Sequence, residues 1–96
     1  MTYFELVQSH RSEILKIAAS NGARNIRIFG SSARHEDDSY SDIDFLVDLE
    51  PGRTLFDLAS MLMDLRDLLK VDVDVATYHS LKKRIRERVL KESVSI

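Results

Sequence analysis

The sequence contains no cysteine, and this absence excludes both a disulfide framework and a thiolate zinc site. Its three histidines, His10, His35 and His79, lie far apart along the chain, so they do not form a histidine-rich metal motif. Any bound metal would therefore need oxygen ligands, which favours Mg²⁺, Mn²⁺ or Ca²⁺.

Long apolar runs are also missing. No stretch approaches the roughly 20 apolar residues that a membrane-spanning helix needs, and the N-terminus lacks the basic and apolar regions of a signal peptide. We therefore expect a cytoplasmic protein without a membrane contact. The formal net charge of −2 argues against a protein that coats DNA or RNA, so direct nucleic-acid binding is not expected.

The composition that remains suits one small folded unit. The 96 residues are 44% hydrophobic and 31% charged, which is ordinary for a compact domain near the lower end of sizes that fold alone. No repeat or linker divides the chain. The sequence therefore predicts a single domain over residues 1–96.

Helical and strand patterns alternate along the chain. A capping box at Thr2 and Glu5 predicts a first helix over residues 2–21, which Gly22 ends. Alternating apolar residues predict strands over 25–29, 42–49 and 71–76. The order indicates a small α/β fold with a three-stranded or slightly larger mixed sheet flanked by helices.

Two further helices are expected in the second half of the chain. A capping box at Thr54 and Asp57 opens one of them, and Ser80 is expected to cap the other. The apolar stripe of the first consists of Leu55, Leu58, Leu62, Leu65 and Leu69, with Met61 and Met63 expected to pack beside it. The second is expected to bury Leu81, Ile85 and Val89.

Four aspartates occupy strand positions that a sheet protein normally avoids. Asp42 and Asp44 should lie on one strand face, about 7 Å apart, while Ile43, Phe45 and Val47 point into the core. Asp72 and Asp74 repeat the pattern on the third predicted strand. Side-by-side carboxylates repel each other. A water-exposed sheet face could explain one pair, but a bound cation explains two pairs better. Three such carboxylates on neighbouring strands could hold two Mg²⁺ ions about 3.5–4 Å apart.

A candidate phosphate site directly follows the first predicted strand. Gly30 allows close approach of the backbone, and N–H groups together with the Ser31 hydroxyl can bond phosphate oxygens. The pair is no Walker loop, because Gly-Lys-Ser/Thr is absent, and alone it would indicate only a turn. Its fixed spacing from Asp42 gives it weight.

The spaced motif is similar to that of a known family. Gly30-Ser31, ten residues and then Asp42-Ile43-Asp44 resembles the signature of the polymerase-β-type nucleotidyltransferases. Within that superfamily, the chain most resembles the smallest branch, the MNT-domain proteins. This resemblance covers residues 25–96. It implies a polymerase-β-like palm fold.

The resemblance also implies roles for individual residues. Asp42, Asp44 and Asp74 would be the catalytic carboxylates and the ligands of two Mg²⁺ ions, with Asp74 also able to help deprotonate the acceptor hydroxyl. Asp72 is the alternative to Asp74. Gly30 and Ser31 would hold the triphosphate of ATP. Arg34 occupies a position where relatives often have arginine, whereas His35 stands where they often have glycine.

The partner expected from the resemblance is a HEPN-domain RNase toxin. The chain would be its antitoxin and would transfer AMP from ATP to a tyrosine hydroxyl of the toxin, with release of pyrophosphate. The small size supports a protein acceptor, since few residues remain for a substrate-binding lobe. Two alternatives stay open: a nucleotidyltransferase with a non-protein acceptor, and a non-catalytic antitoxin that acts by binding alone.

The last part of the chain is basic. Between residues 80 and 96 stand Lys82, Lys83, Arg84, Arg86, Arg88 and Lys91. They indicate either a solvated helix face or a surface that attracts phosphates or an acidic partner. A homodimer and a hetero-oligomer with the toxin are both compatible with the sequence.

Overall fold

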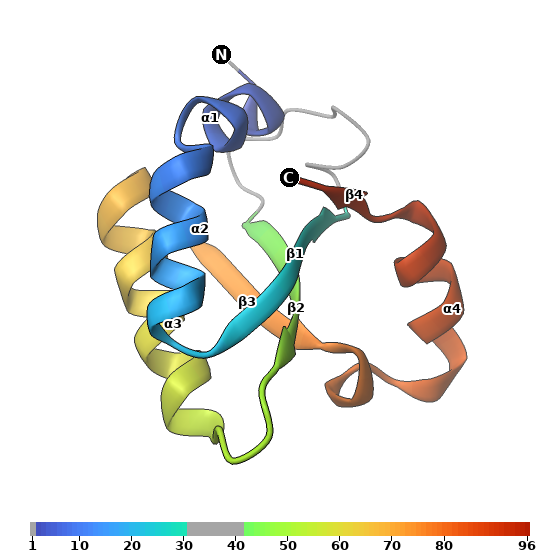
Figure 1. Ribbon diagram of the computed structural model, residues 1–96. Helices are drawn as coiled ribbons and strands as arrows, with labels where there is room; N and C mark the ends of the chain where they lie inside the picture. The colour runs from blue at the N-terminus through green and yellow to red at the C-terminus, as the bar shows by residue number, and fades with distance from the viewer. Residues whose placement is uncertain (1, 31–41) are drawn as a thin grey trace.

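The computed structural model describes residues 2–30 and 42–96 (Figure 1). In chain order its elements are α1 (Tyr3–Ser9), α2 (Arg11–Ser20), β1 (Ala23–Phe29), β2 (Ile43–Leu49), α3 (Leu55–Leu69), β3 (Val73–Thr77), the 3₁₀ turn η1 (Tyr78–Ser80), α4 (Lys83–Glu92) and β4 (Val94–Ser95). Within these ranges, no helix is long and apolar enough to cross a bilayer.

The described strands form one four-stranded sheet in the order β3-β2-β1-β4. β1 pairs antiparallel with β2 and with β4, whereas β2 pairs parallel with β3. A parallel pair needs a long crossover connection, and α3 supplies it. The expected α/β fold with a mixed sheet is therefore confirmed, with β4 added at one edge.

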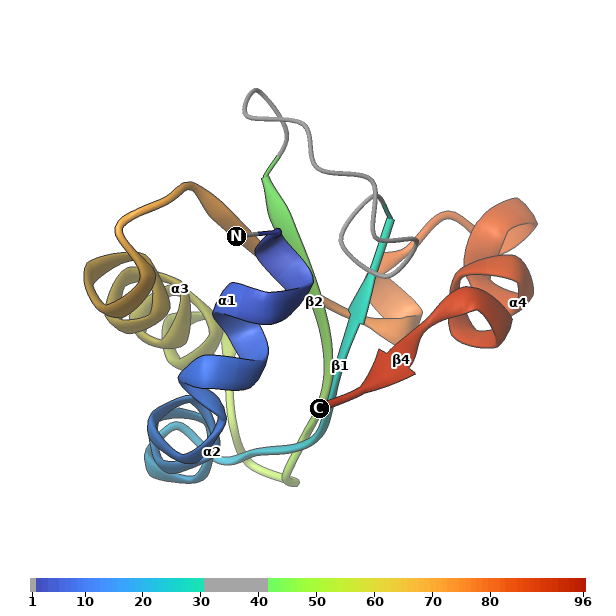
Figure 2. The same cartoon turned by 90° about the horizontal axis from the view of Figure 1, so that it is seen from above.

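The main core lies between the sheet and the helices α1, α2 and α3. Figure 2 shows these three helices on one side of the sheet and α4 on the other. Ile43, Phe45 and Val47 of β2 are buried on the three-helix side, as the alternating pattern predicts. Among the described elements, α4 and η1 lie on the opposite face (Figure 2), and Leu46 and Val89 are buried there.

The predicted first helix is broken into two at His10. The capping box at its start is confirmed, because the Glu5 amide donates to Thr2 Oγ1 over 3.1 Å. At the break, the Ser9 hydroxyl donates to the Leu6 carbonyl over 2.8 Å, and His10 Nδ1 lies 3.2 Å from the same oxygen. Such local side-chain bonds compete with the helical ladder, and His10 has left helical geometry.

The start and the buried face of α3 agree only partly with expectation. The capping box of Thr54 and Asp57 is confirmed, and Met61 and Leu65 are fully buried. Leu55 and Met63, however, are 78% and 63% exposed, so it was wrong to place Leu55 in the apolar stripe and Met63 beside it. Met63 follows the buried Met61 by two residues, and two residues on a helix lie on opposite sides. Leu55 is the first residue of the helix.

The C-terminal part differs from the prediction in its helix start. Ser80 does not cap α4: its hydroxyl accepts from the Thr77 amide over 3.0 Å and belongs to η1. α4 begins three residues later, after Lys82, without a side-chain capping bond. Val89 is buried as expected, whereas Leu81 and Ile85 are only half-buried. β4 was not predicted, because two residues are too few for a recognisable alternation.

Candidate active site

The sheet register aligns Phe29, Asp44 and Asp74 in one row across three strands. Phe29 is the partner of Asp44 on β1, and Asp74 is its partner on β3. Directly paired residues point to the same face, and neighbouring strands lie about 4.8 Å apart. Asp42 lies one residue before the start of β2, near enough for its charge to act on Asp44. The face is the one turned away from α1, α2 and α3 (Figure 2).

Asp44 is the half-buried carboxylate of the row, and its surroundings disfavour its charge. Its pKa is raised from an ordinary 3.8 to about 6, first by burial and then by the negative charges of Asp74 and Asp42. The three carboxylates therefore lie close enough to repel one another. A bound cation would offset both the burial cost and the repulsion.

The carboxylates share a face without already forming a metal cage. Within residues 2–30 and 42–96, no three histidine, aspartate or glutamate side chains are arranged as a ready metal site. Asp74 Oδ1 instead accepts a hydrogen bond from the Val75 amide over 3.0 Å. The donor set, which is all oxygen, fits a hard cation such as Mg²⁺.

Gly30 packs directly against Asp44. Its φ is +71°, and a Cβ placed on it would lie 2.7 Å from Asp44 Oδ2. Glycine is required here both for the left-handed backbone and for the close approach. The first residue of the predicted phosphate loop therefore touches the central carboxylate. Ser31, Arg34 and His35 lie outside the described residues.

Asp72 does not join the row. β3 begins at Val73, so the alternation that grouped Asp72 with Asp74 starts one residue too early. The Asp72 side chain is 72% exposed and pairs with Arg66 Nε of α3 at 3.6 Å. The register thus favours Asp74 over Asp72 as the third carboxylate.

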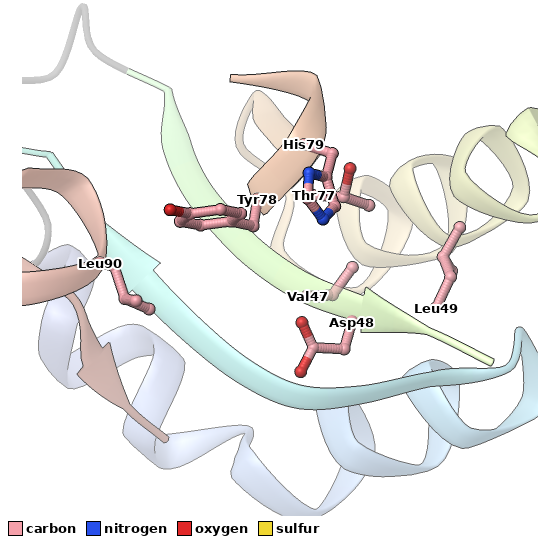
Figure 3. Close-up of a pocket in the computed structure, with 7 residues that line it drawn as sticks. All are labelled: Val47, Asp48, Leu49, Thr77, Tyr78, His79 and Leu90. Atoms are coloured by element: carbon pink, nitrogen blue, oxygen red, sulfur yellow. The ribbon is translucent and has the colours of Figure 1, made fainter. Parts of the chain in front are cut away.

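Two hollows flank α4 on the carboxylate side of the sheet, and the sequence pattern indicates neither. One, of about 410 Å³, is lined by Phe29, Gly30, Ile85, Arg88, Val89 and Glu92. The other, of about 690 Å³, is lined by Val47, Asp48, Leu49, Thr77, Tyr78, His79 and Leu90 (Figure 3). Both depend on how α4 docks on the sheet, which no local sequence signal specifies.

The second hollow is bordered by the contacts that hold η1 to α4. The Tyr78 hydroxyl donates to Glu87, and the Arg86 guanidinium lies 5.6 Å from the centre of the Tyr78 ring. Arg86 also donates to the His79 carbonyl over 2.7 Å. These contacts fix the start of α4 relative to the end of β3, and so fix the wall of both hollows.

A mixed sheet with a glycine turn against paired strand carboxylates defines the chain as a nucleotidyltransferase. Comparison with known proteins agrees, since the model of the nucleotidyltransferase domain family matches residues 11–96. The chain belongs to that family.

Two relatives from archaea match almost the whole chain. MJ0435 of Methanocaldococcus jannaschii, named as a candidate protein adenylyltransferase, is 37% identical over 86 residues, which are 90% of this chain and 92% of the relative. The protein adenylyltransferase MntA of Thermococcus cleftensis is 34% identical over 91 residues, 95% of this chain and 89% of the relative.

Solved structures share the fold. A candidate minimal nucleotidyltransferase matches with a TM-score of 0.88 and 41% identity, covering 100% of this chain and 97% of that one. A chain of a toxin–antitoxin complex crystallised with AMP-PNP matches with a TM-score of 0.73 over 88% of this chain and 69% of that one. Its identity of 22% supports the fold alone.

Proposed function

We propose that the chain is a protein adenylyltransferase, which transfers AMP from ATP to a hydroxyl group of a partner protein and releases pyrophosphate. The observation that carries this proposal is the row in which Asp44 pairs with Asp74 while Gly30 packs against Asp44. It supports a phosphate-binding role for the turn at Gly30, which would then act beside the carboxylates. The names of the two archaeal relatives support a protein as the acceptor.

The transfer is a displacement at the α-phosphorus of ATP. The acceptor oxygen forms a bond to this phosphorus, and the bond to the oxygen that leads to the β-phosphate breaks, so pyrophosphate leaves with the electron pair. Asp74 uses one oxygen for the Val75 amide, and its other oxygen can take the proton of the acceptor hydroxyl. Mg²⁺, when held by Asp42, Asp44 and Asp74, would neutralise charge on the phosphates.

The acceptor that we propose is a tyrosine hydroxyl of a HEPN-domain toxin. A chain of a toxin–antitoxin complex that contains AMP-PNP has the same fold, which supports this choice. The carboxylate face offers a second argument, because among the described elements only α4 and the short turn η1 lie over it (Figure 2). A partner protein could therefore bring its hydroxyl to Asp74 without displacing a lobe of this chain.

The test is incorporation of α-labelled ATP into a co-expressed HEPN partner, with Mg²⁺ or with EDTA. The wild type is compared with Asp42→Asn/Asp44→Asn, which removes two charges at nearly constant volume. Asp72→Asn is the matched control, since Asp72 pairs with Arg66 outside the row. We expect label on the partner with the wild type and with Asp72→Asn, and none with the double variant or with EDTA.

The two alternatives give different results in the same assay. Label that appears on RNA or on a small molecule, and not on the partner, would point to a non-protein acceptor. A partner that binds and is inhibited without gaining label would show an antitoxin that acts by contact alone. Either result would overturn protein adenylylation.

A further inference from the structure

The hollow of about 410 Å³ lies between the end of β1 and one face of α4. Phe29 and Gly30 form its sheet side, and both touch the carboxylate row: Phe29 is paired with Asp44, and Gly30 packs against Asp44. The hollow therefore opens next to the site where the phosphates of a nucleotide would lie. We call it the β1–α4 cleft.

The α4 side of the β1–α4 cleft consists of residues spaced by one helical turn. Ile85, Arg88, Val89 and Glu92 recur at intervals of three and four, which places them on one face of the helix. Ile85 and Val89 supply apolar surface. Arg88 and Glu92 are the charged side chains among the described lining residues.

Arg88 differs from the neighbouring Arg86 in having no protein partner within the described residues. Arg86 bonds two carbonyl oxygens and lies over the ring of Tyr78, so it holds η1 against α4. Arg88 has no hydrogen bond or ion pair in the described part of the chain. An arginine that lines a cleft without a partner is suited to bind an anion, and its planar fork matches two phosphate oxygens.

We propose that the β1–α4 cleft holds the phosphate chain of the nucleotide and that Arg88 binds the β- and γ-phosphates. This inference rests on the proposed function. Gly30 would approach the phosphates from the sheet side and Arg88 from the helix side. Asp44 would lie next to Gly30. When pyrophosphate leaves, the negative charge that it gains is next to the guanidinium, so Arg88 stabilises the leaving group.

The cleft explains one part of the basic C-terminal segment. Arg88 is the basic side chain among the described lining residues of the cleft. The structure therefore assigns Arg88 to the nucleotide, while the basic residues on the other sides of α4 stay available for contact with a partner.

The experiment measures nucleotide binding by the isolated chain, with Mg²⁺, by isothermal titration calorimetry. ATP and AMP are titrated into the wild type, Arg88→Ala, Arg88→Lys and Lys83→Ala. Lys83→Ala is the matched control, because it removes the same charge from the opposite face of the same helix. Circular dichroism checks that each variant is folded.

We expect Arg88→Ala to weaken ATP binding about 10- to 100-fold, the range for a lost charge-assisted pair. AMP binding should stay nearly unchanged, since AMP lacks the β- and γ-phosphates. Arg88→Lys should recover part of the ATP affinity, and Lys83→Ala should match the wild type. In the transfer assay, inhibition by added pyrophosphate should weaken in Arg88→Ala by a similar factor.

Several results would overturn the inference. ATP affinity that is unchanged in Arg88→Ala, or that falls equally in Lys83→Ala, would show that Arg88 makes no specific phosphate contact. An equal loss for ATP and AMP would place Arg88 at the part that both share, the nucleoside or the α-phosphate. Because binding is measured without a partner, the inference can hold even if no label reaches a protein, and it can fail while transfer is intact.

Discussion

Replacing Asp44 with asparagine should stabilise the metal-free protein at neutral pH, although it removes a site residue. Burial and the charges of Asp74 and Asp42 raise the pKa of Asp44 to about 6. The folded chain therefore pays an energetic penalty for ionising this group, which the unfolded chain does not. Asparagine has nearly the same volume and carries no charge, so it removes the penalty.

The magnitude follows from the pKa difference. Each pKa unit corresponds to about 1.4 kcal/mol, so the rise of Asp44 from 3.8 to about 6 would amount to roughly 3 kcal/mol. The side chain is only half-buried, and solvent screening reduces the expected effect to about 1–2 kcal/mol. This is a measurable share of the stability of a small domain.

The pH dependence has a definite sign. Between about pH 4 and pH 6 the folded state binds more protons at Asp44 than the unfolded state, so this group lowers the free energy of unfolding as pH rises. The advantage of Asp44→Asn over the wild type should therefore be near zero below about pH 4. It should grow to its full value above about pH 6.

Urea denaturation in EDTA, followed by circular dichroism at several pH values, measures this difference. Asp57 has a lowered pKa and titrates in the opposite direction, but it is common to both proteins and cancels in the comparison. A difference that is independent of pH, or a less stable asparagine variant at pH 8, would refute the reasoning. With Mg²⁺ added, the wild type should gain stability by binding, and the variant should gain little.

Three other substitutions test the surrounding structure. Gly30→Ala should reduce label transfer at least 10-fold, because its methyl group would meet Asp44 Oδ2, and the left-handed backbone should cost about 1–2 kcal/mol of stability; wild-type transfer would contradict the close contact. Phe45→Ala should lower the free energy of unfolding by about 3–5 kcal/mol in urea, since Phe45 is fully buried in the core; a loss below 1 kcal/mol would argue against its place there. Thr54→Ala should cost about 1 kcal/mol by the same method, because Thr54 Oγ1 accepts from the Phe56 amide at the start of α3; an unchanged midpoint would mean that the cap contributes little.

Features that depend on neighbouring residues were predictable from the sequence. The alternation of Ile43, Phe45 and Val47 with aspartates placed β2 and its buried face correctly, because one face of this strand meets the core and the other does not. The capping boxes at Thr2 and Thr54 are equally local and were predicted correctly. The strand pattern singled out Asp42, Asp44, Asp72 and Asp74, and the family resemblance then favoured Asp74 over Asp72.

Features set by tertiary packing were not predictable in this way. Whether Asp72 or Asp74 joins Asp44 depends on where β3 starts and on the ion pair between Asp72 and Arg66. The β1–α4 cleft depends on contacts between η1 and α4, among them the bonds of Arg86. Ser80 matched the pattern of a helix cap, but its hydroxyl is used by Thr77 in η1.

The parallel pairing of β2 with β3 also governs when the site can come into existence. Asp44 and Asp74 become neighbours only after the whole of α3 has crossed from one strand to the next, and closing such a long connection costs chain entropy. A chain still emerging from the ribosome carries Asp42 and Asp44 well before it can pair them with Asp74. The row of carboxylates is thus a property of the completed fold, and chemistry cannot begin on a half-folded chain.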